Sequence, residues 1–231
     1  MGIVSRLSLS ARPFTYVAHV LALAVAVMVL VWCIHFRGGL AFESTDKSLI
    51  FNTHPVLMLI AIMSYKALPF AKNVKKVIHL VLHGLALLFG IFGIYAAFKF
   101  HNESGFPNLY SFHSWVGLGT ICFYGLQWIF GFACFFFPGA EPNFRRSSLP
   151  WHVLTGIMAY LLAILAAMLG FLEKLTFLED AGLEKYGTEA FLVNFMSMVV
   201  LFLGIFVCLS SISPPSDADE PHHEHDYTQI M

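Results

Sequence analysis

The stretch Asn108-Leu109-Tyr110-Ser111-Phe112-His113-Ser114-Trp115 opens an apolar run that continues to Phe137. The run is long enough to cross a membrane as a helix, and it places His113 about one turn inside its start. An ionisable side chain inside a membrane helix is costly unless a partner holds it, so it marks a functional site by default. The sequence therefore predicts that His113 binds a partner supplied by another part of the chain.

The composition is that of an integral membrane protein. Of its 231 residues 58% are hydrophobic and only 12% are charged, and the mean hydropathy is +0.74. Soluble domains carry roughly one-quarter charged residues. A bilayer core of about 30 Å takes some 20 apolar residues per helix. We therefore predict an all-α integral membrane protein of six transmembrane helices, at residues 14–36, a weaker 50–69, 77–99, 111–137, 150–172 and 190–212.

The basic residues predict the orientation of these helices, because cytosolic loops are enriched in Lys and Arg. Six spans put both termini on one side. The segments on that side hold Arg6, Arg12, Lys66, Lys72, Lys75, Lys76, Arg145 and Arg146, against Arg37, Lys47, Lys99, Lys174 and Lys185 in the opposite loops. Residues 1–13 are then a cytosolic N-terminus, residues 14–212 the membrane domain, and the polar residues 213–231 a disordered cytosolic tail.

Two classes of site are excluded by the same sequence. The net charge is −1 and no basic patch is interleaved with aromatic residues, so we expect no nucleic-acid partner. The four cysteines fall inside apolar runs, with neither CxxC nor CxxCH spacing. They are interpreted as small buried hydrophobic residues, and a covalently attached c-type haem is excluded.

Four histidines near helix ends alternate between the two membrane faces. His54 and His113 begin helices that enter from outside, whereas His79 and His152 begin helices that enter from the cytosol. A b-type haem is bound non-covalently, and its iron takes one imidazole above and one below the ring from different helices. The pattern predicts two bis-histidine b haems, with irons roughly 20 Å apart. By spacing His83 could replace His79, but His79 matches the depth of His152 better.

A resemblance to a known family is carried by four motifs. They are Tyr110-Ser111-Phe112-His113-Ser114-Trp115, Asn52-Thr53-His54-Pro55, the His79 and His83 pair, and Phe137-Pro138-Gly139-Ala140 followed by Pro150-Trp151-His152. In these motifs the chain resembles the ascorbate-dependent cytochrome b561 family, over residues 14–212 and especially its plant members.

The resemblance implies a fold and a reaction. It pairs His54 with His113 and His79 with His152 in a core of the second to fifth helices, with the first and sixth peripheral. It also implies a homodimer in a vacuolar or other endomembrane, with the plasma membrane as the alternative. It implies an enzyme that transfers electrons from cytosolic ascorbate to monodehydroascorbate or ferric iron outside. By resemblance ascorbate binds at Lys72, Lys76 and Arg145, and the acceptor binds at Phe100, His101 and Tyr110.

The second helix departs from the family pattern, since about nine residues are missing between the ligands His54 and His79. From Pro55 to Leu68 the chain rises only about 21 Å as a helix, which barely crosses a bilayer. Three alternative consequences are expected. Either His54 lies further inward, or the inner end of the helix unwinds, or the chain loads its outer haem poorly.

Two other functions compete with this prediction. The histidines, with His222, His223 and His225 in the tail, could belong to a metal transporter. A transporter would predict carboxylates within the spans, and none is found away from their ends. A dihaem anchor for a quinone-linked dehydrogenase also fits, although a basic rim favours a small anionic donor.

Overall fold

The structure, a computed structural model, describes residues 10–60 and 72–213, and all of its regular elements in these ranges are helices. Five are long and apolar enough to cross a membrane: α1 with its π-helical extension (Ala11–Val31 and Trp32–Phe36), α3 (Lys72–Ser104), α4 (Phe112–Phe135), α5 (Pro142–Asp180) and α6 (Thr188–Ile212). α2 (Lys47–Ile60) has 14 residues. The chain is therefore a multi-pass membrane protein.

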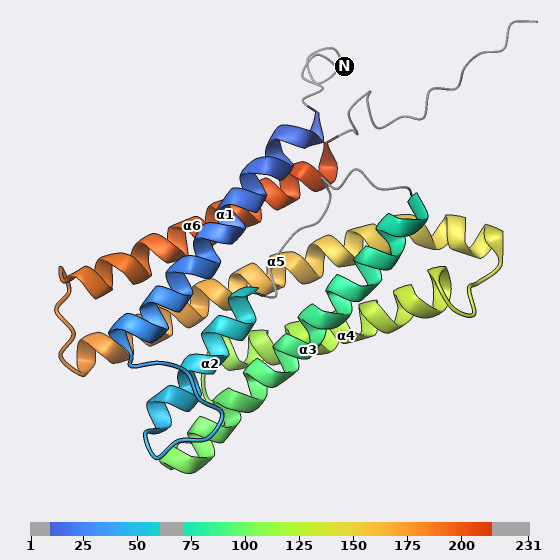
Figure 1. Cartoon of the computed structure of the whole chain (residues 1–231). Helices are drawn as coiled ribbons and strands as arrows, with labels where there is room; N and C mark the ends of the chain where they lie inside the picture. The colour runs from blue at the N-terminus through green and yellow to red at the C-terminus, as the bar shows by residue number, and fades with distance from the viewer. Residues whose placement is uncertain (1–9, 61–71, 214–231) are drawn as a thin grey trace, which may run out of the picture.

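The long helices run up and down, so that their two ends form two faces. One face gathers the starts of α1, α3 and α5 with the ends of α4 and α6, and the other gathers the opposite ends with the start of α2 (Figure 1). α2 packs on α3, α4 packs on α5, and α1 packs on α6. The α1–α6 pair reaches the other helices through α5 and α2.

The tightest packing lies between α1, α5 and α6. Small and β-branched side chains, including Ala18, Val25 and Val200, are almost fully buried there. Gly204 lets α6 approach α5, because a Cβ at this position would lie 3.1 Å from Ile164. Small residues at helix contacts are typical of membrane proteins, where close van der Waals packing replaces the hydrophobic effect.

α2 begins further from the membrane centre than the sequence predicted. Asp46 caps it by accepting hydrogen bonds from the Ser48 amide (3.0 Å) and hydroxyl (2.7 Å), which hold the pKa of this carboxyl below its usual value. Asn52 and Thr53, which precede His54 in the sequence, lie within the helix and are buried. His54 consequently lies two turns inside α2 and does not begin it, and Pro55 is in the helix interior.

Asn52 and Thr53 bind the preceding loop instead of capping the helix. The Asn52 amide donates to the carbonyl oxygens of Arg37 (3.0 Å) and Gly39 (2.9 Å), and the Thr53 hydroxyl donates to Ala41 (3.1 Å). Buried carbonyl groups need such partners. The two polar residues therefore fix the loop after α1 against α2 beside His54.

The prediction for the start of the fifth helix was also wrong. α5 begins at Pro142 and has 39 residues, so Pro150 and His152 lie within it. Pro142 suits the first turn, where a proline loses no hydrogen bond. The predicted cytosolic loop at 138–149 shortens to a turn that ends at Glu141. The inner part of the predicted second helix, residues 61–68, and the tail from residue 214 lie outside the described residues.

Candidate functional site

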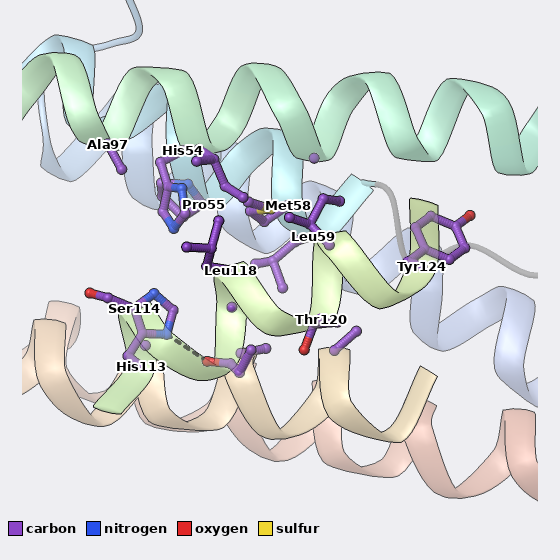
Figure 2. A pocket seen from close by; sticks show the side chains of 18 of the residues that line it. His54, Pro55, Met58, Leu59, Ala97, His113, Ser114, Leu118, Thr120 and Tyr124 are labelled. Carbon is purple, nitrogen blue, oxygen red and sulfur yellow. Dashed lines mark hydrogen bonds between the residues drawn. The ribbon is translucent and has the colours of Figure 1, made fainter. Parts of the chain in front are cut away.

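The predicted outer pair of histidines meets inside the bundle. The rings of His54 on α2 and His113 on α4 have centroids 6.0 Å apart, at an interplanar angle of 84°. Figure 2 shows both side chains reaching into the same pocket, with Pro55, Met58 and Leu118 beside them. Placement of His54 two turns inside α2 brings its ring level with that of His113, which lies in the first turn of α4.

The predicted inner pair has nearly the same geometry. The rings of His79 on α3 and His152 on α5 have centroids 6.1 Å apart, at an angle of 77°. His83 lies next to His79, with ring centroids 4.3 Å apart. Its Nδ1 is 2.7 Å from the hydroxyl of Tyr124, which also donates to the His83 carbonyl oxygen (3.1 Å). Tyr124 thus holds His83, while His79 faces His152 at the spacing of the outer pair.

Three of the four rings are anchored through Nδ1. His54 Nδ1 lies 2.9 Å from the carbonyl oxygen of Gly93, and His113 Nδ1 lies 2.9 Å from that of Ala166. A carbonyl oxygen only accepts, so Nδ1 carries the proton in both rings and Nε2 of the neutral ring is left with a lone pair. His152 Nδ1 lies 2.9 Å from the side-chain amide of Gln127. Metal-binding histidines donate their second ring N–H to an acceptor, as His54 and His113 do here.

Two glycines make room for the imidazoles. A Cβ at Gly170 would lie 2.8 Å from His113 Cε1, and a Cβ at Gly131 would lie 2.9 Å from His152 Cε1. Neither distance is sterically possible without movement of the ring. In each pair, therefore, one histidine ring lies directly against a glycine of the neighbouring helix.

A single cavity of about 920 Å³ is lined by both histidine pairs. Its wall is mostly apolar and contains many small residues from α3, α4 and α5, among them Ala86, Gly90, Ala97, Gly117, Gly156, Ala163 and Ala167. Cofactor sites are typically apolar cavities with a few fixed polar groups. Small side chains on facing helices leave space for a flat molecule edge-on between them.

The two pairs lie far apart along the bundle. On α3, His79 and Gly93, the partner of His54, are separated by a rise of about 21 Å. On α4, His113 and Gln127, the partner of His152, are separated by a similar rise of about 21 Å. This agrees with the distance expected from the membrane thickness.

The histidine pairs fit an iron bound by two imidazoles. A transition metal binds an imidazole nitrogen at about 2 Å, so rings on opposite sides of one iron have centroids about 6 Å apart. Both pairs have this separation. The Nδ1 anchors leave Nε2 of His54 and His113 free for a metal, as bis-imidazole ligation requires. Within residues 10–60 and 72–213, no three His, Cys, Asp or Glu side chains form a group that could hold a bare metal ion.

Comparison with known proteins decides the family. The family model for eukaryotic cytochrome b561 matches residues 47–178, more than half of the chain. The chain belongs to the cytochrome b561 family. This segment contains all four histidines of the two pairs, and membership implies a b-type haem.

Relatives of the cytochrome b561 family match almost the whole chain. The chain is 62% identical over 225 residues to the rice protein "Probable ascorbate-specific transmembrane electron transporter 1", covering 94% of this chain and 96% of the relative. It is 57% identical to "Transmembrane ascorbate ferrireductase 1" of Arabidopsis thaliana, covering 88% of each. It is 32% identical to the mouse "Transmembrane ascorbate-dependent reductase CYB561", covering 96% and 93%.

The predicted acceptor residues, Phe100, His101 and Tyr110, lie together at one end of the cavity that both histidine pairs line. The ring of His101 lies 5.7 Å from that of Phe100 and 6.0 Å from that of Tyr110. Phe51 continues this cluster inward, since its ring centroid is 5.2 Å from Phe100 and 6.0 Å from His54. A row of aromatic rings thus leads from the outer histidine pair to Tyr110, which is 51% exposed.

The predicted ascorbate residues lie beyond the inner pair, at the other end. Lys76 is one turn before His79 on α3, and Arg145 is two turns before His152 on α5, so each shares a helix face with its histidine. The Lys76 side chain is exposed and that of Arg145 is half-buried. Lys72 is the first residue of α3, and its side chain lies outside the described part of the protein.

Sequence reasoning missed the residues that position the histidines. Gln127 was noted only as a polar residue within the fourth span, yet its amide contacts His152 Nδ1 and donates to the His152 carbonyl oxygen (2.6 Å). Thr155 in turn donates to Gln127 Oε1 (2.9 Å). A lone glutamine in an apolar span is the signal that would have found this contact, because a buried amide needs partners.

Substitution of Gly170 tests whether the outer histidine pair needs the space that this glycine leaves for the His113 ring. In Gly170→Ala the new Cβ displaces the His113 ring, so we expect occupancy of one haem to fall several-fold while the other is retained. The haem-to-protein ratio of the purified protein measures this. Gly119→Ala is the matched control, because a Cβ there meets nothing within 4 Å. Equal haem content in all three proteins would contradict the assignment of this seat.

Proposed function

We propose that this protein transfers electrons across the membrane from cytosolic ascorbate, through two bis-histidine b haems, to monodehydroascorbate or ferric iron on the other side. The observation that carries the proposal is the presence of two histidine pairs, with centroids 6.0 and 6.1 Å apart, at opposite ends of one cavity. The names of relatives at 57–62% identity, which refer to ascorbate, transmembrane electron transport and ferric reduction, support the same reaction.

His54 and His113 would hold the outer haem, and His79 and His152 the inner haem. When bound, each haem would supply an iron that takes up and releases one electron, and the two imidazoles of its histidine pair would hold it. The protein fixes the rings of His54, His113 and His152 through Gly93, Ala166 and Gln127. Rigid ligands favour electron transfer because little rearrangement accompanies the change of iron charge.

The cytosolic end would bind the ascorbate anion. Lys76 and Arg145 place positive charge on the helix faces that lead to His79 and His152, and Lys72 at the start of α3 adds to it. Cations attract a monoanion and stabilise the anionic form that loses an electron readily.

The opposite end would bind the acceptor between Phe100, His101 and Tyr110. Burial and the carboxylate of Glu173 raise the pKa of Tyr110, so its phenol stays protonated at neutral pH and can donate a hydrogen bond. The His101 ring lies beside that of Tyr110, tilted by 33°, and an imidazole can donate or accept a proton. These groups suit an oxygen-rich acceptor such as monodehydroascorbate or a ferric chelate.

The proposal also includes an orientation in the membrane and an assembly. The Lys- and Arg-rich face, which gathers the starts of α1, α3 and α5, is the cytosolic one, so the N- and C-termini are cytosolic. The membrane is a vacuolar or other endomembrane, and the protein is a homodimer in it. α2 to α5 form the haem-binding bundle, with α1 and α6 peripheral.

Haem counting with ligand variants tests the proposal directly. The purified protein is expected to bind two b-type haems per chain and to be reduced by ascorbate in two phases. His54→Ala and His79→Ala should each remove one haem and one phase, because the iron loses an axial ligand. One haem per chain in the wild type, with an unchanged spectrum in His54→Ala, would contradict the outer site.

Charge removal at the cytosolic end tests the donor site. Lys76→Ala and Arg145→Ala are each expected to raise the ascorbate concentration for half-maximal haem reduction about tenfold, since a hydrogen bond to a charged group is worth about 1.5–3 kcal/mol. Stopped-flow reduction of the holoprotein measures this. Lys185→Ala is the control, because Lys185 is 72% exposed at the opposite end. An equal response of all three variants would reject this site.

A further inference from the structure

Lys174 is a cation inside the outer end of the cavity. It lies on α5 one turn beyond Gly170, against which His113 is seated, and it lines the same cavity as both outer histidines. Its side chain is partly buried, and Nζ lies 4.2 Å from the centroid of the Phe51 ring. Phe51 itself is one turn from His54 and contacts its ring. Lys174 therefore lies at the rim of the space between His54 and His113.

The carboxylates near Lys174 are engaged by other groups. Glu173 accepts a hydrogen bond from Ser111 (3.0 Å). Glu189 is bound by Arg37 and by Trp32 Nε1 (2.8 Å), so Arg37 and Glu189 neutralise each other. Among the described residues Lys174 forms neither an ion pair nor a hydrogen bond. Glu173 keeps its negative charge, but neither carboxylate forms an ion pair with the Lys174 ammonium.

The contact with Phe51 does not balance the cost of placing this charge in the bundle. A cation–π contact contributes about 0.5–2 kcal/mol, whereas removing an ammonium group from water costs several kcal/mol. A partly buried lysine of a membrane protein therefore calls for an anion. No carboxylate of the described cavity wall forms an ion pair with Lys174, so its ammonium is placed to bind an anion carried by the molecule that fills the cavity.

A b-type haem carries its own anions, because two propionate carboxylates project from one edge of the porphyrin. We infer that Lys174 binds a propionate carboxylate of the haem held by His54 and His113, and that its charge makes this haem easier to reduce. The inference rests on the proposed function, since it requires the outer haem. A nearby positive charge stabilises the added electron, so Lys174 favours passage of electrons from the inner to the outer haem.

A redox titration of the holoprotein tests this inference. In Lys174→Gln the equilibrium constant for reduction of the outer haem should fall about tenfold, a shift of about 59 mV to lower potential for one electron. The inner haem should keep its potential, which also shows that the variant is folded. The outer transition is identified as the one that disappears in His113→Ala. Lys174→Arg, which keeps the charge, should stay within threefold of the wild type.

A control variant and the haem content of the two Lys174 variants separate the alternatives. Lys185→Gln removes an exposed lysine at the same end and should leave both potentials unchanged. If Lys174→Gln instead loses the outer haem and Lys174→Arg retains it, Lys174 is the anchor of that haem, as inferred. Loss of the outer haem in both variants would overturn the inference, because charge would then not be the property that matters.

Three other results would overturn the inference. They are two haems with unchanged potentials in Lys174→Gln, equal shifts of both haems, and unchanged potentials with a raised KM for monodehydroascorbate. The last would assign Lys174 to the acceptor instead of the haem. In each case the wild type still holds two haems, so the proposed function survives. A wild type with one haem would reject the outer site and, with it, the role of Lys174.

Discussion

An imidazole in the interior of a membrane protein must satisfy both of its nitrogens, and this requirement governs the bundle. In the outer pair, Nδ1 of His54 and of His113 donates to a backbone carbonyl on a neighbouring helix. Each bond ties two helices together, α2 to α3 and α4 to α5. These are also the helix pairs that pack on each other. The remaining nitrogen is directed to a partner that the protein does not provide, and a haem iron meets this need.

The two ends of the cavity differ in the way a directional electron carrier requires. The inner end is approached along helix faces that carry Lys76 and Arg145. The outer end is closed by aromatic rings, among which Phe51 and Phe100 stand between the histidine pair and the surface. One end of the cavity thus presents cationic side chains and the other end aromatic ones.

Much of this arrangement could be predicted from the sequence, because membrane thickness restricts where a histidine can lie. The alternation of His54, His79, His113 and His152 along successive spans was sufficient to pair them by face, and the structure brings the members of each pair together. His79 could be preferred over His83 by depth alone. The structure adds a reason, since Tyr124 holds the His83 ring.

Helix boundaries could not be predicted as well, because prolines and polar residues have more than one use. Pro55 and Pro150 were taken as helix starts, but both lie inside helices, and Asn52 binds loop carbonyls instead of capping α2. The helix extends outward to Lys47, so His54 reaches the level of His113, and residues 61–68 of the predicted span lie outside the described residues. The roles of Gly131 and Gly170 depend on contacts between helices that no sequence pattern reveals, whereas Gln127 stands out in the sequence as a lone amide in an apolar span.

The most direct test of the central claim is electron transfer across a sealed membrane. The holoprotein is inserted into vesicles that contain ascorbate, and reduction of external ferricyanide, which does not cross the bilayer, is followed by absorbance. The account predicts reduction that depends on the protein and is abolished by His113→Ala and by His152→Ala, since each breaks one of the two pairs. Reduction at the wild-type rate in either variant would contradict a path that uses both histidine pairs.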